Sequence, residues 1–127
     1  MSRYIAFHDY QGDVSKIVSR AQGLKQRYGK PCWITEFAIN KWARIQGGHC
    51  DECNITRPMQ DAYMKQVLPA LESSDAVFRY AWYSARDEPN ADINSGNLLV
   101  WNDSTPTLTS TGVIYKTHAG ISADAIA

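Results

Sequence analysis

One carboxylate stands out in the chain because of the residues that surround it. Glu36 lies near the end of the segment PCWITEFAIN, residues 31–40, which is rich in strand-forming aromatic and β-branched residues. A lone acid at such a place is either a solvated strand end or a group with a chemical role. Because carboxylates act as nucleophiles and as general acids or bases, Glu36 is the first candidate for catalysis.

Two further segments end in groups that can bind or react. AFHDYQGD contains His8 and Tyr10, and VFRYAWYS contains Trp82 near its end. The carboxyl ends of parallel strands form one edge of a sheet, where such folds keep their chemistry. We therefore expect Glu36, His8, Tyr10 and Trp82 to lie around one pocket.

The alternation of side chains along a strand gives each candidate a face. Counting along the second strand, Glu36 shares a face with Ile34 and Cys32, whereas Trp33, Thr35 and Phe37 point to the other face, toward helices. In the same way, His8 and Tyr10 share one face of the first strand. Trp82 shares a face with Tyr80 and Ser84. The predicted pocket lies on the Glu36 face.

The elements that position these residues alternate along the chain. The pattern predicts strands over 4–10, 32–38 and 76–84, and helices that begin after Asp13 and Thr56 as N-caps. Residues 29–31 end the first helix, and Pro69 kinks the second or ends it early. A short hairpin over 97–109 and a helix over about 110–118 follow. This order predicts an α/β fold with a parallel sheet.

Three cysteines leave two interpretations open. Cys50 and Cys53 form a CxxC pair in a Gly-rich loop, and they are either a local disulfide in an oxidising compartment or free thiols. A redox role is disfavoured because the acidic residues between them raise the pKa of a thiol. Together with His49 they give too few ligands for zinc, and we expect no metal and no other cofactor. Cys32 opens a strand and is expected to be buried and inert.

Composition excludes several classes of protein. The chain has 127 residues, and 13 basic residues balance 13 acidic ones, so nothing favours binding to nucleic acid or to a membrane surface. No apolar run is long enough to span a bilayer, and residues 1–10 lack the apolar region of a signal peptide. The chain is therefore expected to be globular and to carry no secretion signal of its own.

In its motifs, the chain resembles the glycosyl hydrolase catalytic core of glycoside hydrolase family 128, which includes fungal alkali-sensitive linkage proteins and endo-β-1,3-glucanases. The matching segments are AFHDYQGD, YGKPCWITEFA, VFRYAWYSAR and NLLVWNDSTPTLTSTGVIYK. They follow the order of the family and cover most of the chain. The second and third segments are specific when they occur together.

The resemblance implies a TIM-barrel hydrolase that cuts β-glucan with retention of configuration. By this resemblance Glu36 is the nucleophile at the end of strand seven. Tyr10 would hold it ionised and oriented, and Trp82 would be a platform under the sugar. The complete protein would be extracellular or bound to the cell wall, with a polysaccharide as its substrate.

The chain departs from the family pattern in its length. A TIM barrel needs about 250 residues, whereas this chain shows three βα units that match the last three of the barrel. We expect residues 1–120 to be the C-terminal part of a catalytic domain and 121–127 to be a frayed tail. The acid/base on strand four would then be absent. The open sheet edges would favour self-association. The alternative function is a non-catalytic module that binds glucan or cell wall.

Overall fold

The computed structural model describes residues 2–40, 54–89, 93–101 and 104–118. The elements alternate along the chain as the sequence predicts. In order they are β1 (Ile5–Asp9), α1 (Val14–Tyr28), β2 (Cys32–Phe37), α3 (Arg57–Glu72), β3 (Val77–Trp82), the 3₁₀ turn η1 (Asn94–Gly96) and α4 (Ser110–His118).

The two long helices begin and end at residues that favour such ends. The Asp13 side chain accepts a hydrogen bond from the backbone N–H of Lys16 (3.0 Å) and caps α1, and Thr56 caps α3 in the same manner. Gly29 ends α1 with a positive φ of 69°, which glycine adopts without steric cost. These three predictions are confirmed. Helix α3 does not end early at Pro69, because the lost N–H falls in its final turn and removes a single helical bond.

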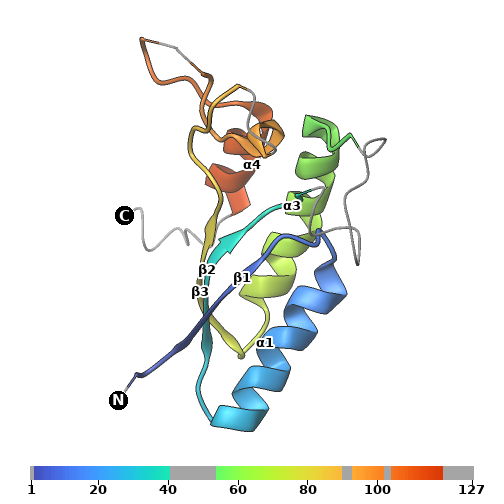
Figure 1. The fold of residues 1–127 in the computed structure, drawn as a ribbon, viewed down its shortest axis with the longest axis vertical. Helices are drawn as coiled ribbons and strands as arrows, with labels where there is room; N and C mark the ends of the chain where they lie inside the picture. The colour runs from blue at the N-terminus through green and yellow to red at the C-terminus, as the bar shows by residue number, and fades with distance from the viewer. Residues whose placement is uncertain (1, 41–53, 90–92, 102–103, 119–127) are drawn as a thin grey trace.

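The three strands form a parallel sheet in the order β1-β2-β3. Their carboxyl ends therefore meet at one edge, and α1 and α3 precede β2 and β3 in the chain. Figure 1 shows the three strands rising in the same direction, with α1 and α3 side by side along one side of them. The predicted hairpin after β3 is present as an antiparallel bridge between Leu99 and Leu108, and α4 has the predicted bounds.

A one-residue irregularity in β2 decides which side chains face the helices. Ile34 pairs with Phe7 and Glu36 with His8, so β2 advances two residues while β1 advances one. The pairing with β3 shows the same extra residue, because β2 advances from Ile34 to Phe37 while β3 advances by only two positions. Such an insertion is a β-bulge, and it reverses the alternation of faces beyond it.

The bulge corrects the face assignment made from simple alternation. Cys32 and Ile34 are fully buried on the helix side of the sheet, and Phe37 is buried with them after the bulge. Trp33 is 39% exposed and lies on the opposite, open side. Glu36 would have followed Ile34 toward the helices in a regular strand. The extra residue instead places Glu36 on the open side.

The core lies between the helix side of the sheet and the two long helices. Its α3 members are Tyr63, Met64, Val67, Leu68 and Leu71, and α1 contributes Ile17 and Ala21. The large apolar side chains among them contribute about 1.5–3 kcal/mol each when fully buried, so this layer is the main source of stability for the fold. It also fixes the strands against a rigid support.

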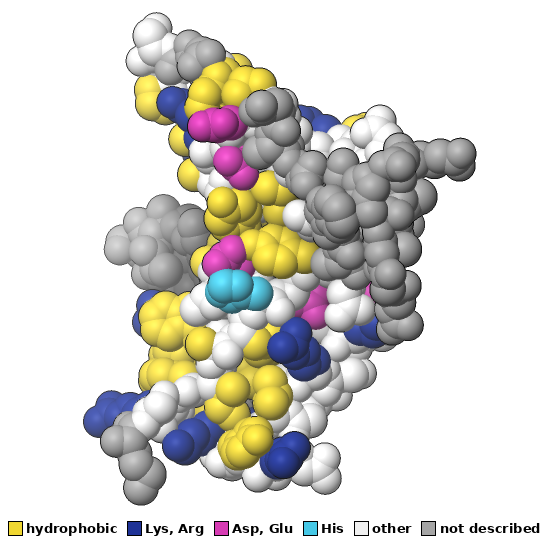
Figure 2. All heavy atoms as spheres, viewed as in Figure 1, with side chains coloured by type: hydrophobic (Ala, Val, Ile, Leu, Met, Phe, Trp, Pro, Cys, Tyr) yellow, Lys and Arg dark blue, Asp and Glu magenta, His cyan; other side chains and the backbone are white. Residues whose placement is uncertain are grey.

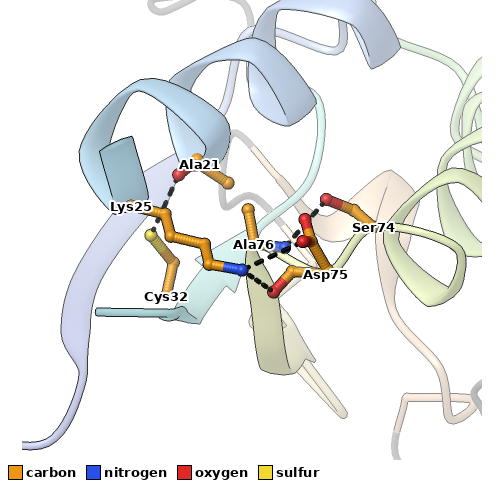
Figure 3. Close-up of polar contacts among 6 residues, drawn as sticks. All are labelled: Ala21, Lys25, Cys32, Ser74, Asp75 and Ala76. Carbon is orange, nitrogen blue, oxygen red and sulfur yellow. Dashed lines mark hydrogen bonds and ion pairs between the residues drawn. The ribbon is translucent and has the colours of Figure 1, made fainter. Parts of the chain in front are cut away.

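A polar contact closes the amino-terminal end of the sheet. Figure 3 shows Lys25 of α1 reaching toward Asp75 in the turn that precedes β3, and its Nζ lies 3.0 Å from the Asp75 carboxylate. Beneath it, the buried Cys32 thiol donates to the carbonyl of Ala21 (3.6 Å). Burial raises the pKa of Cys32. The predicted burial of this cysteine is thus confirmed.

The open side of the sheet carries a cluster of aromatic side chains far from the carboxyl ends. Tyr4 stacks on Phe78 with ring centroids 4.1 Å apart, and Trp33 meets both rings edge to face. Phe78 is 43% exposed. Tyr4 precedes β1 and Phe78 belongs to β3, so this stacking joins the two outer parts of the sheet. No helix in the described part of the chain is long and apolar enough to cross a membrane.

Candidate functional site: a carboxylate at the carboxyl edge of the sheet

The Glu36 carboxylate lies at the carboxyl edge of the sheet, on the open side. Its side chain is 32% exposed, so it is supported by protein and still reachable from solvent. Figure 2 shows one face of the molecule on which a histidine lies against an acidic side chain, with hydrophobic side chains above and below the pair. This partly exposed position suits a group that must meet a ligand.

Each of the two carboxylate oxygens has its own partner from β1 or the residue that follows it. The Tyr10 hydroxyl donates a hydrogen bond to Oε1 of Glu36. His8 Nε2 lies 3.0 Å from Oε2, as an ion pair when the imidazole is protonated and as a hydrogen bond when Nε2 carries the proton of a neutral ring. Bonds to an ionised acceptor are stronger than neutral ones and fix its orientation. The structure therefore brings three of the four predicted site residues together.

The electrostatics keep Tyr10 in its donating form. Burial raises the pKa of the Tyr10 hydroxyl well above its usual value, and the hydrogen bond and negative charge of Glu36 raise it further. The carboxylate of Asp87, in the loop after β3, acts in the same direction. Because the phenol stays protonated, it remains a hydrogen-bond donor to Glu36 at physiological pH.

The fourth predicted residue, Trp82, does not join this group. It is only 6% exposed and lies on the helix side, where its ring packs edge to face on Phe37 with centroids 5.2 Å apart. Its indole N–H donates to the carbonyl of Gly96 (2.8 Å). The prediction that Trp82 lines the pocket is wrong for a physical reason: the large ring fills the core between the sheet and α3.

The neighbouring residue, Tyr83, takes the place that the sequence assigned to Trp82. Its ring meets the Tyr10 ring nearly perpendicularly, with centroids 6.2 Å apart, and it is half-buried. Its backbone N–H donates to the carbonyl of Phe37 (3.1 Å), which ties the end of β3 to the end of β2. Alternation along the chain places Tyr83 opposite to Trp82, and the burial of Trp82 against α3 leaves Tyr83 on the open side.

The disulfide or free-thiol alternatives for Cys50 and Cys53 stay predictions. Cys50 and Cys53 lie outside the described residues. Within the described part of the chain, no group of three or more His, Cys, Asp or Glu side chains is arranged to hold a metal ion. Asp9 stands between His8 and Tyr10 in sequence but is 2% exposed and points to the helix side, where burial raises its pKa.

Comparison with known proteins extends these observations. The model of the glycosyl hydrolase catalytic core matches residues 2–115. Alkali-sensitive linkage protein 1 of Schizosaccharomyces pombe is 31% identical over 115 residues, which cover 88% of this chain and 19% of that protein. The chain therefore spans about a fifth of the length of this relative.

Two solved structures have the same fold. One is a glycoside hydrolase family 128 subgroup I endo-β-1,3-glucanase from Amycolatopsis mediterranei in complex with laminaritriose and laminaribiose. It has a TM-score of 0.71 and 24% identity, over 93% of this chain and 46% of that one. The other is a subgroup VII oligosaccharide-binding protein from Cryptococcus neoformans, with a TM-score of 0.68 and 20% identity, over 94% of this chain and 41% of that one.

These matches agree with one another. The family match covers nearly all of the described residues, including the strands that carry His8, Glu36 and Tyr83. The chain belongs to the glycosyl hydrolase catalytic core family.

Proposed function

We propose that this chain is the nucleophile-bearing part of a retaining glycoside hydrolase that cuts β-1,3-glucan. In this proposal β1, β2 and β3 are the last three strands of a (β/α)8 barrel, and residues 1–120 form the C-terminal part of its catalytic domain. Support comes from the parallel strand order with helices on one side and from the match to less than half of a β-1,3-glucanase.

A single observation carries the catalytic part of the proposal. Glu36 stands at the carboxyl edge of the sheet with one donor on Oε1 and a second group on Oε2. An acid that only ended a strand in solvent would not need both oxygens to be held. Such partners suit a nucleophile before substrate binds, because its attack on an anomeric carbon requires a fixed direction and an ionised form.

The proposed reaction follows from the retaining mechanism. One Glu36 oxygen attacks the anomeric carbon, the glycosidic bond breaks, and a glycosyl ester forms while a second carboxyl group protonates the leaving oxygen. That group then takes a proton from water, and the water oxygen attacks the anomeric carbon and releases Glu36. The second carboxyl must lie about 5–5.5 Å away. We propose that it is supplied by a strand outside this chain.

The tyrosines at the site have separate roles in this proposal. Tyr10 keeps one oxygen of the nucleophile hydrogen-bonded, so that the other is free to attack once substrate displaces His8. Tyr83 offers a half-buried ring beside Tyr10, and the flat face of such a ring suits the C–H side of a pyranose. Tyr83 thus replaces Trp82 as the proposed sugar platform.

The test removes the negative charge of Glu36 without changing the size of its side chain. In the complete protein, Glu36→Gln should abolish release of reducing sugar from β-1,3-glucan while the circular dichroism spectrum stays unchanged. The matched control is Glu72→Gln, because Glu72 also accepts a tyrosine hydroxyl, from Tyr80 at 2.5 Å, but lies at the end of α3. Unchanged sugar release by Glu36→Gln would refute the assignment of the nucleophile.

A second candidate function is glucan binding without hydrolysis. It is favoured by the similarity to the oligosaccharide-binding protein of subgroup VII, which shares this fold. In that case Glu36, His8 and Tyr83 would form hydrogen bonds and ring contacts with the sugar. This function would be supported over the first if the protein left laminarihexaose intact over a long incubation and if Tyr83→Ala lowered the affinity for this oligosaccharide.

The proposal also has a consequence for the isolated chain. The two outer strands, β1 and β3, and the aromatic cluster of Tyr4, Trp33 and Phe78 would be covered in a closed barrel. On their own they favour strand pairing and apolar contact between copies. We expect the 127-residue chain to self-associate in sedimentation velocity experiments. A monodisperse monomer at micromolar concentration would contradict this expectation.

A further inference from the structure

The segment that follows Glu36 is held by a buried side chain of α3. Gln60 has 0% exposure and makes three hydrogen bonds with its amide group. Its Oε1 accepts from the backbone N–H of Ile39 (3.0 Å), and its Nε2 donates to the carbonyl of the same residue (2.8 Å) and to the Ser95 hydroxyl (3.2 Å). The amide therefore binds Ile39 as a neighbouring strand would.

Ile39 is also held from its other side by the chain that carries Tyr10. An antiparallel bridge joins it to Gln11, and the backbone N–H of Asn40 donates to the carbonyl of Tyr10 (3.0 Å). The backbone therefore continues to pair after β1 and β2 have ended. Because Tyr10 and Ile39 are fixed to each other here, a shift of Ile39 moves Tyr10 relative to Glu36.

The same amide reaches toward the end of β3. Ser95 and Gly96 belong to η1, and the carbonyl of Gly96 accepts the indole N–H of Trp82. A Cβ added to Gly96 would lie 3.4 Å from both the Gln60 amide and the Trp82 ring, so the three groups are in close contact. Gln60 therefore contacts two segments that hold the strand ends. One is Ile39, which follows β2 and pairs with the chain that follows β1. The other is η1, which accepts a hydrogen bond from Trp82 at the end of β3.

We infer that Gln60 is a positioning residue for the Glu36 site, acting through Ile39 on the distance between Tyr10 and Glu36. The inference deepens the proposed function and rests on it only for its effect on turnover. Geometry carries it: one buried amide supplies both backbone partners of Ile39, and no other side chain in the described residues bonds to that backbone. Gln60 itself lies on the helix side and does not reach the open side.

The first test measures the hydrogen bond between Tyr10 and Glu36 without any need for activity. The chain is labelled with ¹³C at tyrosine Cζ, and the Tyr10 resonance is assigned with Tyr10→Phe. Glu36→Ala gives the reference shift for Tyr10 without its acceptor. Gln60→Met keeps the size of the side chain and removes the amide, and it should move the Tyr10 resonance at least halfway to that reference. Gln66→Met, on the exposed face of the same helix, should not move it.

A conservative variant separates positioning from general destabilisation. In Gln60→Glu the buried carboxyl is neutral at low pH, where it can again accept from and donate to Ile39, and charged at high pH, where it repels the Ile39 carbonyl. The Tyr10 chemical shift of this variant is compared with that of wild type at each pH. The two shifts should agree at low pH and differ at high pH. This variant also decides the question if Gln60→Met does not fold.

Activity of the complete protein provides a separate readout. Gln60→Met should lower kcat about tenfold to a hundredfold with little change in KM, because a small displacement of a catalytic group costs that much. If Glu36→Gln keeps full activity, the proposed function fails while the Tyr10 resonance still tests the role of Gln60. A folded Gln60→Met, or a Gln60→Glu at high pH, with the wild-type Tyr10 shift would overturn the inference.

Discussion

In the proposed function, the hydrogen bond from Tyr10 to Glu36 contributes to catalysis, and Tyr10→Phe removes this bond while keeping the ring. A hydrogen bond to a charged group contributes about 1.5–3 kcal/mol. Because the Glu36 side chain is 32% exposed, water replaces part of the lost bond and the lower figure of about 1.5 kcal/mol applies. If the bond is at full strength in the transition state, this energy corresponds to about a tenfold loss in kcat/KM.

The assay is the initial rate of reducing-sugar release from a soluble β-1,3-glucan by the complete protein. Tyr80→Phe is the matched control, since the Tyr80 hydroxyl also donates to a glutamate, Glu72, which lies at the end of α3. The control should keep the wild-type rate. A rate for Tyr10→Phe within about twofold of wild type, a difference below about 0.5 kcal/mol, would refute the view that Tyr10 orients the nucleophile.

Three further predictions concern the surroundings of the site. In urea unfolding, Gly12→Ala should lower the free energy of unfolding by about 1–3 kcal/mol more than Gly29→Ala does. Both glycines have a positive φ, but only a Cβ on Gly12 would meet Ile39, at 2.6 Å. Asp9→Asn should raise the urea midpoint at pH 7, with the gain vanishing near pH 4. Burial raises the pKa of the Asp9 carboxyl in the folded protein, so ionisation of Asp9 destabilises the fold as the pH rises. Equal urea midpoints for wild type and Asp9→Asn at pH 7 would contradict this prediction. Tyr83→Ala should weaken binding of laminarihexaose about tenfold by calorimetry, and an unchanged affinity would remove it from the site.

Local sequence patterns were sufficient to predict the elements. The caps at Asp13 and Thr56 and the left-handed glycine at position 29 have side-chain or backbone requirements that are visible in sequence. The order of strands and helices then predicted the parallel sheet and the edge at which Glu36, His8 and Tyr10 meet. These features depend on near neighbours in the chain, which is why they were predictable.

The faces of the strands were less predictable because they depend on pairing between distant segments. Alternation assigned Glu36 to the side of Ile34, and the extra residue in β2 reversed this without any glycine or proline to mark it. The assignment of Trp82 to the pocket failed for a related reason. Alternation shows that the two rings point in opposite directions, but only contact with α3 shows which of them is buried.

The bulge in β2 has a consequence for transplanting this site into another protein. The bulge shifts the alternation of side chains within one short strand. The strand therefore contributes first Cys32 and Ile34 to the packed layer and then Glu36 to the open side. A designer who copied the glutamate alone into a regular strand would point it into the hydrophobic interior. A transplanted site must therefore include both Thr35 and Glu36 and must keep the extra residue of β2 relative to β1 and β3.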